Sequence, residues 1–160
     1  MLNPNFNKKN SINTTQEKLD ELDMENYRQL HNVVLKFSNN STEIKKMFIA
    51  TLTTISTILF TFFKEKLSLD IILIYIFLAS IIVALLFLML DSYTYYYQSK
   101  LRIIMKNIVI DIKFRNNIII NLKHEQIRKF HLLLKSVFNF SNNIYYFIIL
   151  LSILYLIFHL

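Results

Sequence analysis

The chain contains no cysteine and no glycine. Without cysteine it has no disulfide, no thiolate ligand for a metal and no cysteine nucleophile. Phosphate-cradling loops need glycine, because their backbone adopts positive φ angles and approaches the ligand closely. The sequence therefore excludes a Walker loop and a dinucleotide-binding fingerprint, together with the enzyme classes that depend on them.

Apolar residues are in excess. They make up 54% of the 160 residues, whereas globular proteins have about 45–50%. The excess is concentrated in three blocks without Asp, Glu, Lys or Arg, at 47–63, 71–90 and 144–160. As a helix, the second block is about 30 Å long, which is one hydrocarbon thickness. The sequence predicts an all-α membrane protein with a two-span helical hairpin (41–90) and a third, C-terminal span. The alternative for the third block is a helix lying against the first two.

The segment before the first block is polar. Residues 1–13 are rich in asparagine and predict a flexible tail. Thr14 and Glu17 have the spacing of a capping box, and an amphipathic helix is predicted over 14–38, with an apolar stripe from Leu19 to Phe37. The Ser- and Asn-rich stretch 38–41 is predicted to end it.

The segment between the second and third blocks, 91–143, is basic. Within it, apolar and polar residues alternate over 107–114, which is the spacing of a strand, and 118–122 could pair back as a small β-hairpin. A continued helix is the alternative. A further helix is predicted from His124 to Lys135.

The net charge of +7 would suggest nucleic acid as the partner of a soluble protein. Here the cations flank apolar blocks, so anionic lipid headgroups explain them better, and no nucleic acid is expected. Lys and Arg outnumber Asp and Glu most strongly in 91–143, slightly in 1–46, and not at all in the 64–70 connection. The sequence predicts a multi-pass protein of the cell inner (plasma) membrane with the N-terminus cytoplasmic and the C-terminus outside.

Four tyrosines follow the second block within "LDSYTYYYQSKLR" (90–102). Tyrosine accumulates at membrane interfaces because its ring is apolar and its hydroxyl is hydrated. An aspartate at the point where the helix leaves the membrane can be hydrated by water or can pair with a cation. Basic side chains one to two turns later can reach the headgroups. We expect these residues to anchor the helix at the membrane interface: Asp91, Tyr93, Tyr95, Tyr96, Tyr97, Lys100 and Arg102.

Small residues recur at helical spacing in the first two blocks. They let membrane helices approach closely, and threonines can form hydrogen bonds between helices. Packing within the hairpin is one interpretation. The other is a self-association face whose hydroxyls line a narrow pore. The residues concerned are Ala50, Thr54, Thr57, Thr61, Ser80 and Ala84.

Few residues suggest catalysis or metal binding. His124 and His131 are seven apart, whereas zinc helices place ligands four apart. Asp91 with Arg102 or His124 is the only visible candidate for a catalytic pair. A proton-coupled transporter typically needs an ionisable group within its spans, and only His159, near the chain end, would qualify. We expect no enzyme activity, no metal and no cofactor.

Three stretches carry a resemblance to a known family: "NNSTEIKKMFIATL" (39–52), "LDSYTYYYQSKLRIIM" (90–105) and "VIDIKF" (109–114). They resemble an uncharacterised family of small bacterial inner-membrane proteins, which leave their second span through an LDxYY motif followed by an arginine. Arg102 matches that arginine, whereas Gln98 replaces the usual glutamate and Met105 the usual tyrosine. The resemblance implies the topology of three apolar helices; the family has no settled activity to carry over to this chain.

Two functions remain open from the sequence. The first is a non-enzymatic, self-associating inner-membrane protein, a homo-oligomer that perturbs the bilayer or forms a channel in response to a partner. The alternative is a membrane anchor that recruits a soluble protein partner through its N-terminal helix. Both place the lipid bilayer among the partners.

Overall fold

The computed structural model describes residues 4–118 and 123–159, with side chains from residue 15 onward. Four α-helices follow one another along the chain: α1 (Pro4–Phe63), α2 (Leu69–Arg115), α3 (Lys129–Val137) and α4 (Asn143–His159). A short 3₁₀ turn, η1 (Phe140–Asn142), precedes α4. The described residues include no strand, so the all-α prediction is confirmed.

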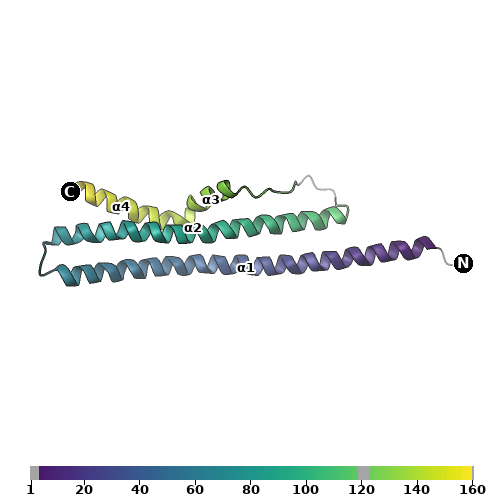
Figure 1. Ribbon diagram of the computed structural model, residues 1–160, viewed down its shortest axis with the longest axis horizontal. Coiled ribbons are helices and arrows are strands. Elements are labelled where there is room, and N and C mark those ends of the chain that lie inside the picture. The colour runs from purple at the N-terminus through teal and green to yellow at the C-terminus, as the bar shows by residue number, and fades with distance from the viewer. Residues whose placement is uncertain (1–3, 119–122, 160) are drawn as a thin grey trace.

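Two long helices dominate the molecule. α1 has 60 residues and α2 has 47, and they form an antiparallel hairpin that spans the length of the protein (Figure 1). The connection between them is short, and Ser68 is the N-cap of α2, with Asp70 in the first turn, where the helix dipole favours an anion. α3 and α4 lie along α2 (Figure 1).

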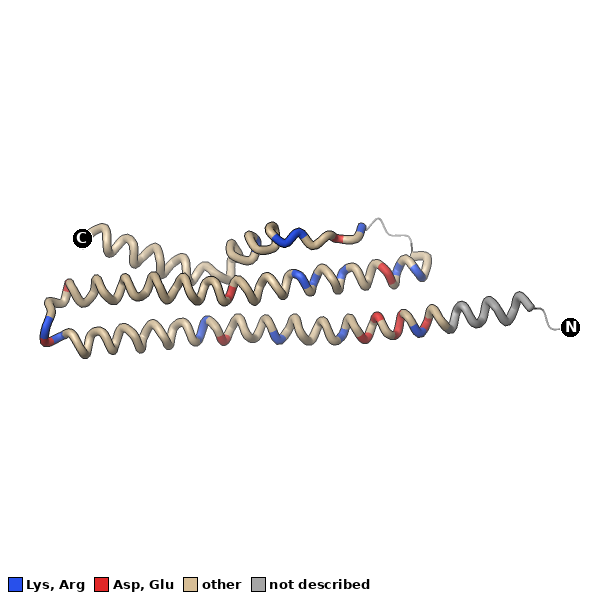
Figure 2. Tube along the Cα trace, in the orientation of Figure 1, with Lys and Arg blue, Asp and Glu red and all other residues tan. Residues whose placement is uncertain are grey.

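Three helices are long and apolar enough to cross a membrane: α1, α2 and the helix from Phe140 to His159. Figure 2 shows that charged residues cluster on the half of the hairpin nearer the N-terminus and at the α1–α2 connection, with a stretch free of charge between them. Since α2 is about 70 Å long and a hydrocarbon core about 30 Å thick, the hairpin extends well beyond a bilayer. We call this extension, residues 15–44 of α1 and 92–115 of α2, the stalk.

The predicted helix end at 38–41 is wrong, because α1 continues through this stretch. Ser41 is buried, and its hydroxyl accepts a hydrogen bond from Lys45. The hydroxyl of Thr42 donates to the carbonyl of Ser38 one turn earlier. Local side-chain bonds and packing against α2 therefore outweigh the weak helix propensity of serine and asparagine. The helix also begins at Pro4, upstream of the predicted capping box and within the predicted tail.

The predicted β-hairpin is also wrong. Residues 107–115 continue α2, and residues 119–122 of its second strand lie outside the described residues. Ile103 and Ile110, two helical turns apart, are buried in the stalk. Of the isoleucines that suggested strand alternation, Ile110 is buried and Ile108 and Ile112 are half-buried, so they pack along a helix instead. The helix predicted from His124 begins later, at Lys129.

α2 ends in a Schellman motif without glycine. The backbone N–H of Ile118 donates to the carbonyl of Lys113, and that of Asn117 donates to Phe114. Asn117 has φ 52°, a left-handed conformation that asparagine tolerates better than most residues.

The far end of the stalk is held by an ionic clasp. Arg115 of α2 forms ion pairs with Asp20, at 2.9 Å, and with Asp23 of α1. Asn116 donates a hydrogen bond to Asp20, and this bond, with the nearby Arg115, lowers the pKa of the Asp20 carboxyl. The clasp joins the two helices far from the membrane.

Candidate functional site

A buried ion pair connects α1 and α2 where they leave the apolar stretch. Lys45 Nζ lies 2.6 Å from Asp91 Oδ2. The Asp91 side chain is completely buried, and the Lys45 side chain is 22% exposed. Lys45 also donates to Ser41 Oγ at 2.7 Å and lies over the ring of Tyr95, 5.5 Å from its centroid. A charge this deeply buried needs partners on every side.

α4 and α2 supply the remaining partners of the carboxylate. The hydroxyl of Tyr145 in α4 donates to Asp91 Oδ2 at 3.2 Å, and Thr94 Oγ1 lies 3.3 Å from Asp91 Oδ1. Tyr145 is itself completely buried. One carboxylate thus contacts all three apolar helices at a single level, and its bonds set their relative register.

The corner between α3 and α4 is attached to α2 by Asn142. Its side-chain amide, completely buried, donates to Ser92 Oγ of α2 at 3.2 Å and to the carbonyls of Ser136 and Val137 at 2.9 Å each. Asn142 Oδ1 has no partner among the described residues. The corner is therefore held against α2 immediately beside the ion pair.

An apolar core lies next to the ion pair, on the side of the apolar stretch. Phe48 is completely buried there, with Ala84, Val83 and Leu88 of α2 around it. Its ring meets Tyr145 edge-on at 4.9 Å and Phe87 at 5.6 Å. Aromatic packing thus joins the same three helices as the carboxylate.

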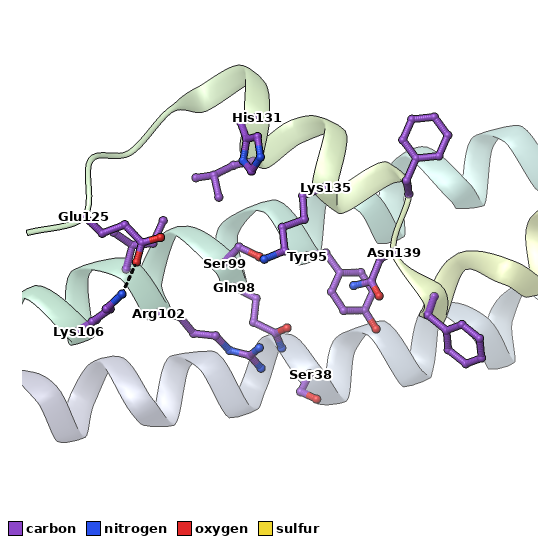
Figure 3. A pocket seen from close by; sticks show the side chains of 14 residues that line it. Ser38, Tyr95, Gln98, Ser99, Arg102, Lys106, Glu125, His131, Lys135 and Asn139 are labelled. Carbon is purple, nitrogen blue, oxygen red and sulfur yellow. Dashed lines mark hydrogen bonds and ion pairs between the residues drawn. The ribbon is translucent and has the colours of Figure 1, made fainter. Parts of the chain in front are cut away.

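A groove opens on the stalk side of the ion pair, between α2, α3 and the start of η1 (Figure 3). Its volume is about 750 Å³. Basic, hydroxyl and amide side chains from α2 and α3 dominate its lining, with one residue from α1. We call it the basic groove; it is lined by Ser38, Tyr95, Gln98, Ser99, Arg102, Ile103, Lys106, Glu125, His131, Leu132, Lys135, Phe138, Asn139 and Phe140.

The single carboxylate of the basic groove is already engaged. Glu125 Oε2 lies 2.8 Å from Lys106 Nζ, and this bond lowers the pKa of the Glu125 carboxyl. The Glu125 backbone also exchanges hydrogen bonds of 3.0 and 3.1 Å with the side chain of Asn107. By contrast, Arg102 and Lys135 have no ion-pair partner in the described part of the chain.

The two sets of predicted small residues lie in different environments. In α1 they are exposed on the surface of the single chain, and in α2 they are half-buried or buried. Ala84 packs in the core, whereas Ser80 bonds back to the carbonyl of Ile76. Packing within the hairpin therefore accounts for the α2 pair and not for the α1 set of Ala50, Thr54, Thr57 and Thr61.

The residues predicted to anchor α2 at the membrane interface also lie in different environments. Asp91 does pair with a cation, but it is buried rather than hydrated. Tyr93 is exposed, and its hydroxyl lies 3.1 Å from that of Tyr97, whose ring also contacts Tyr96 and lies under Lys100. Tyr95 and Arg102 line the basic groove instead.

The candidate catalytic pair is not assembled. Asp91 is bonded to Lys45 and Tyr145, whereas His124 lies 2.9 Å from Asp111 on the stalk. Among the described residues, no group of His, Asp and Glu is placed to hold a metal ion.

Sequence reasoning missed Lys45, Ser41, Tyr145 and Asn142 as parts of one cluster. For Lys45 a signal existed, because it lies 19 residues before Lys64 and Asp91 lies 23 residues after Ser68, and these separations differ by about one helical turn. An antiparallel hairpin places such residues opposite each other. For Tyr145 and Asn142 no such signal exists, since their position depends on how α4 docks.

Comparison with known protein families, with curated proteins and with solved structures found no match.

Proposed function

We propose that the protein is a non-enzymatic integral membrane protein that self-associates through one face of α1. That face consists of Ala50, Thr54, Thr57 and Thr61, and we call it the threonine face. Its assembly forms a homo-oligomer that perturbs the bilayer or conducts ions.

The exposure of the threonine face is the observation that carries the proposal. All four of its residues are exposed, although α1 packs against α2 on another side. The hydroxyl of Thr54 donates to the carbonyl of Ala50, and that of Thr57 to Thr53, each at 2.8 Å. These two hydroxyls are therefore satisfied in lipid, and the small side chains of the threonine face let a second helix approach closely.

The test is the mass of the purified protein in nanodiscs, corrected for lipid. We expect a defined oligomer for the natural chain and a monomer for the variant Thr54→Leu/Thr57→Leu, because leucine holds a neighbouring helix away. Ile82→Phe, which enlarges an exposed residue of α2, is the control and should keep the oligomer. A natural chain that is monomeric, or an oligomer that survives the double substitution, contradicts the proposal. Ion leakage from vesicles should follow the oligomer in each variant.

We further propose that the stalk lies in the cytoplasm, and the α1–α2 connection and the C-terminus outside the inner membrane. The support is the excess of Lys and Arg over Asp and Glu in 91–143, the segment that contains the α2 part of the stalk and α3. Because the chain has no cysteine, single cysteines report topology without background. We expect a membrane-impermeant maleimide to label Ser68→Cys in intact spheroplasts, and Asn40→Cys only after permeabilisation. The reverse pattern contradicts this orientation.

A second candidate function is recruitment of a soluble protein by the stalk. Most of the predicted apolar stripe is covered by α2, since Val34 is buried and Leu30 and Phe37 are half-buried. Leu19 and Leu22 remain 48% and 59% exposed near the tip. If the tip recruits a partner, Leu19→Ser/Leu22→Ser should remove a co-purifying protein that Leu85→Ser, on the membrane segment, retains. An unchanged set of co-purifying proteins excludes this function.

A further inference from the structure

We propose that the basic groove binds the phosphate group of an anionic phospholipid from the membrane leaflet at the base of the stalk. This inference goes beyond self-association and does not depend on it. It rests on three features of the groove: its unpaired cations, its hydrogen-bond donors and its position.

The first feature is a pair of cations in the basic groove. Arg102 from α2 and Lys135 from α3 line the same groove, and neither has an ion-pair partner among the described residues. A guanidinium fork binds two phosphate oxygens at once, and an ammonium adds a mobile point charge. Figure 3 shows Lys135 reaching from α3 toward α2, with the guanidinium of Arg102 beside Gln98. In the proposed complex one phosphate contacts both cations, which come from separate helices.

Neutral donors complete the site. Tyr95 and Ser99 contribute a hydroxyl to the lining, and such groups donate hydrogen bonds to phosphate oxygens. Gln98 contributes an amide whose nitrogen also donates to the carbonyl of Val34 at 3.4 Å. Glu125 is engaged with Lys106 at 2.8 Å. The groove therefore offers no free carboxylate to the quaternary ammonium of a zwitterionic headgroup. This favours an anionic phospholipid over phosphatidylcholine.

The position of the groove selects a lipid rather than a dissolved phosphate. Tyr95 follows Asp91 by one helical turn, so the groove begins where the helices leave the apolar stretch. Phe138 and Phe140, at its edge, are 74% and 85% exposed. Aromatic side chains of this kind are favoured at the interface between headgroups and acyl chains. A phosphate in the groove would leave its acyl chains beside these rings and the bilayer.

The test measures which lipid the protein retains. The full chain is reconstituted in equal amounts of phosphatidylglycerol and phosphatidylcholine, extracted in mild detergent, and its bound lipid is identified by native mass spectrometry. We expect preferential retention of phosphatidylglycerol. Each substitution, Arg102→Gln or Lys135→Gln, should weaken it at least about fivefold, because it removes a charge-assisted hydrogen bond to the phosphate.

Lys100→Gln is the matched control, because it removes one cation at a similar depth from α2 but outside the groove. It should retain the lipid within about twofold, because Lys100 does not line the groove and makes no direct bond to the proposed phosphate. Arg102→Lys keeps the positive charge but loses the two parallel N–H donors of the guanidinium. If this variant remains folded, we expect it to retain phosphatidylglycerol more weakly than the natural chain and more strongly than Arg102→Gln.

Three results overturn the proposal. The first is equal retention of the two lipids. The second is equal loss in Lys100→Gln and Arg102→Gln, which indicates general attraction to an anionic surface. The third is complete displacement of the lipid by millimolar glycerol 3-phosphate, which assigns the groove to a soluble phosphate. The self-association variant Thr54→Leu/Thr57→Leu should keep its lipid, so failure of either proposal is distinguishable from failure of the other.

Discussion

Replacing Lys45 by methionine is expected to destabilise the protein by about 3–5 kcal/mol, the usual cost of leaving one member of a buried ion pair alone. The substitution keeps the apolar stem and removes the ammonium. Asp91, completely buried, would then retain only Tyr145 and Thr94 as side-chain partners. Unfolding in mixed micelles of increasing denaturing detergent, followed by circular dichroism, measures the loss.

Asp91→Asn should cost less than Lys45→Met. The asparagine can still accept a hydrogen bond from Tyr145, and Lys45, 22% exposed, can extend toward water. The double variant Lys45→Met/Asp91→Asn should be more stable than Lys45→Met alone, because it removes the unpaired charge. If the two single effects simply add, the ion pair does not couple α1 to α2 and this interpretation is wrong.

Phe48→Ala should be the second most damaging single change. Phe48 is completely buried, and its ring contacts Tyr145 at 4.9 Å and Phe87 at 5.6 Å. Truncating a buried phenylalanine costs about 3–5 kcal/mol in water-soluble proteins. In a membrane the loss of packing dominates, because the unfolded helices are also surrounded by apolar lipid. We therefore expect the lower end of that range.

Phe62→Ala is the matched control for this prediction. Phe62 lies in the same helix and is 71% exposed, so its removal should change stability by less than about 0.5 kcal/mol. The same detergent titration compares the two variants. Similar losses for both would show that the buried aromatic contact does not hold the three helices together.

Much of the fold could be predicted from the sequence, because hydrophobicity acts locally. The block 71–90, and the block 144–160 as far as His159, lie within helices that are long and apolar enough to span a membrane. The errors at 38–41 and 107–114 have a common cause. Serine, asparagine and isoleucine have weak helix propensities, and packing across the stalk overrides them.

The candidate site was predictable only in part. Asp91 and Arg102 were identified from their place after the second span, and the structure assigns them to different surroundings: a buried ion pair and the basic groove. The groove itself depends on how α3 folds back along α2. No sequence pattern near Lys135 or His131 indicates that α3 packs against α2, because this contact joins segments far apart in the chain.

The stalk also has a mechanical consequence. α2 continues about 36 Å beyond Asp91 without a break, and the clasp between Arg115 and Asp20 joins it to α1 at the tip. Two helices fixed to each other at both ends resist bending far more than either helix alone. A sideways load on the tip would therefore reach the bilayer as a torque on the helices that meet at Asp91, and the stalk would work as a lever.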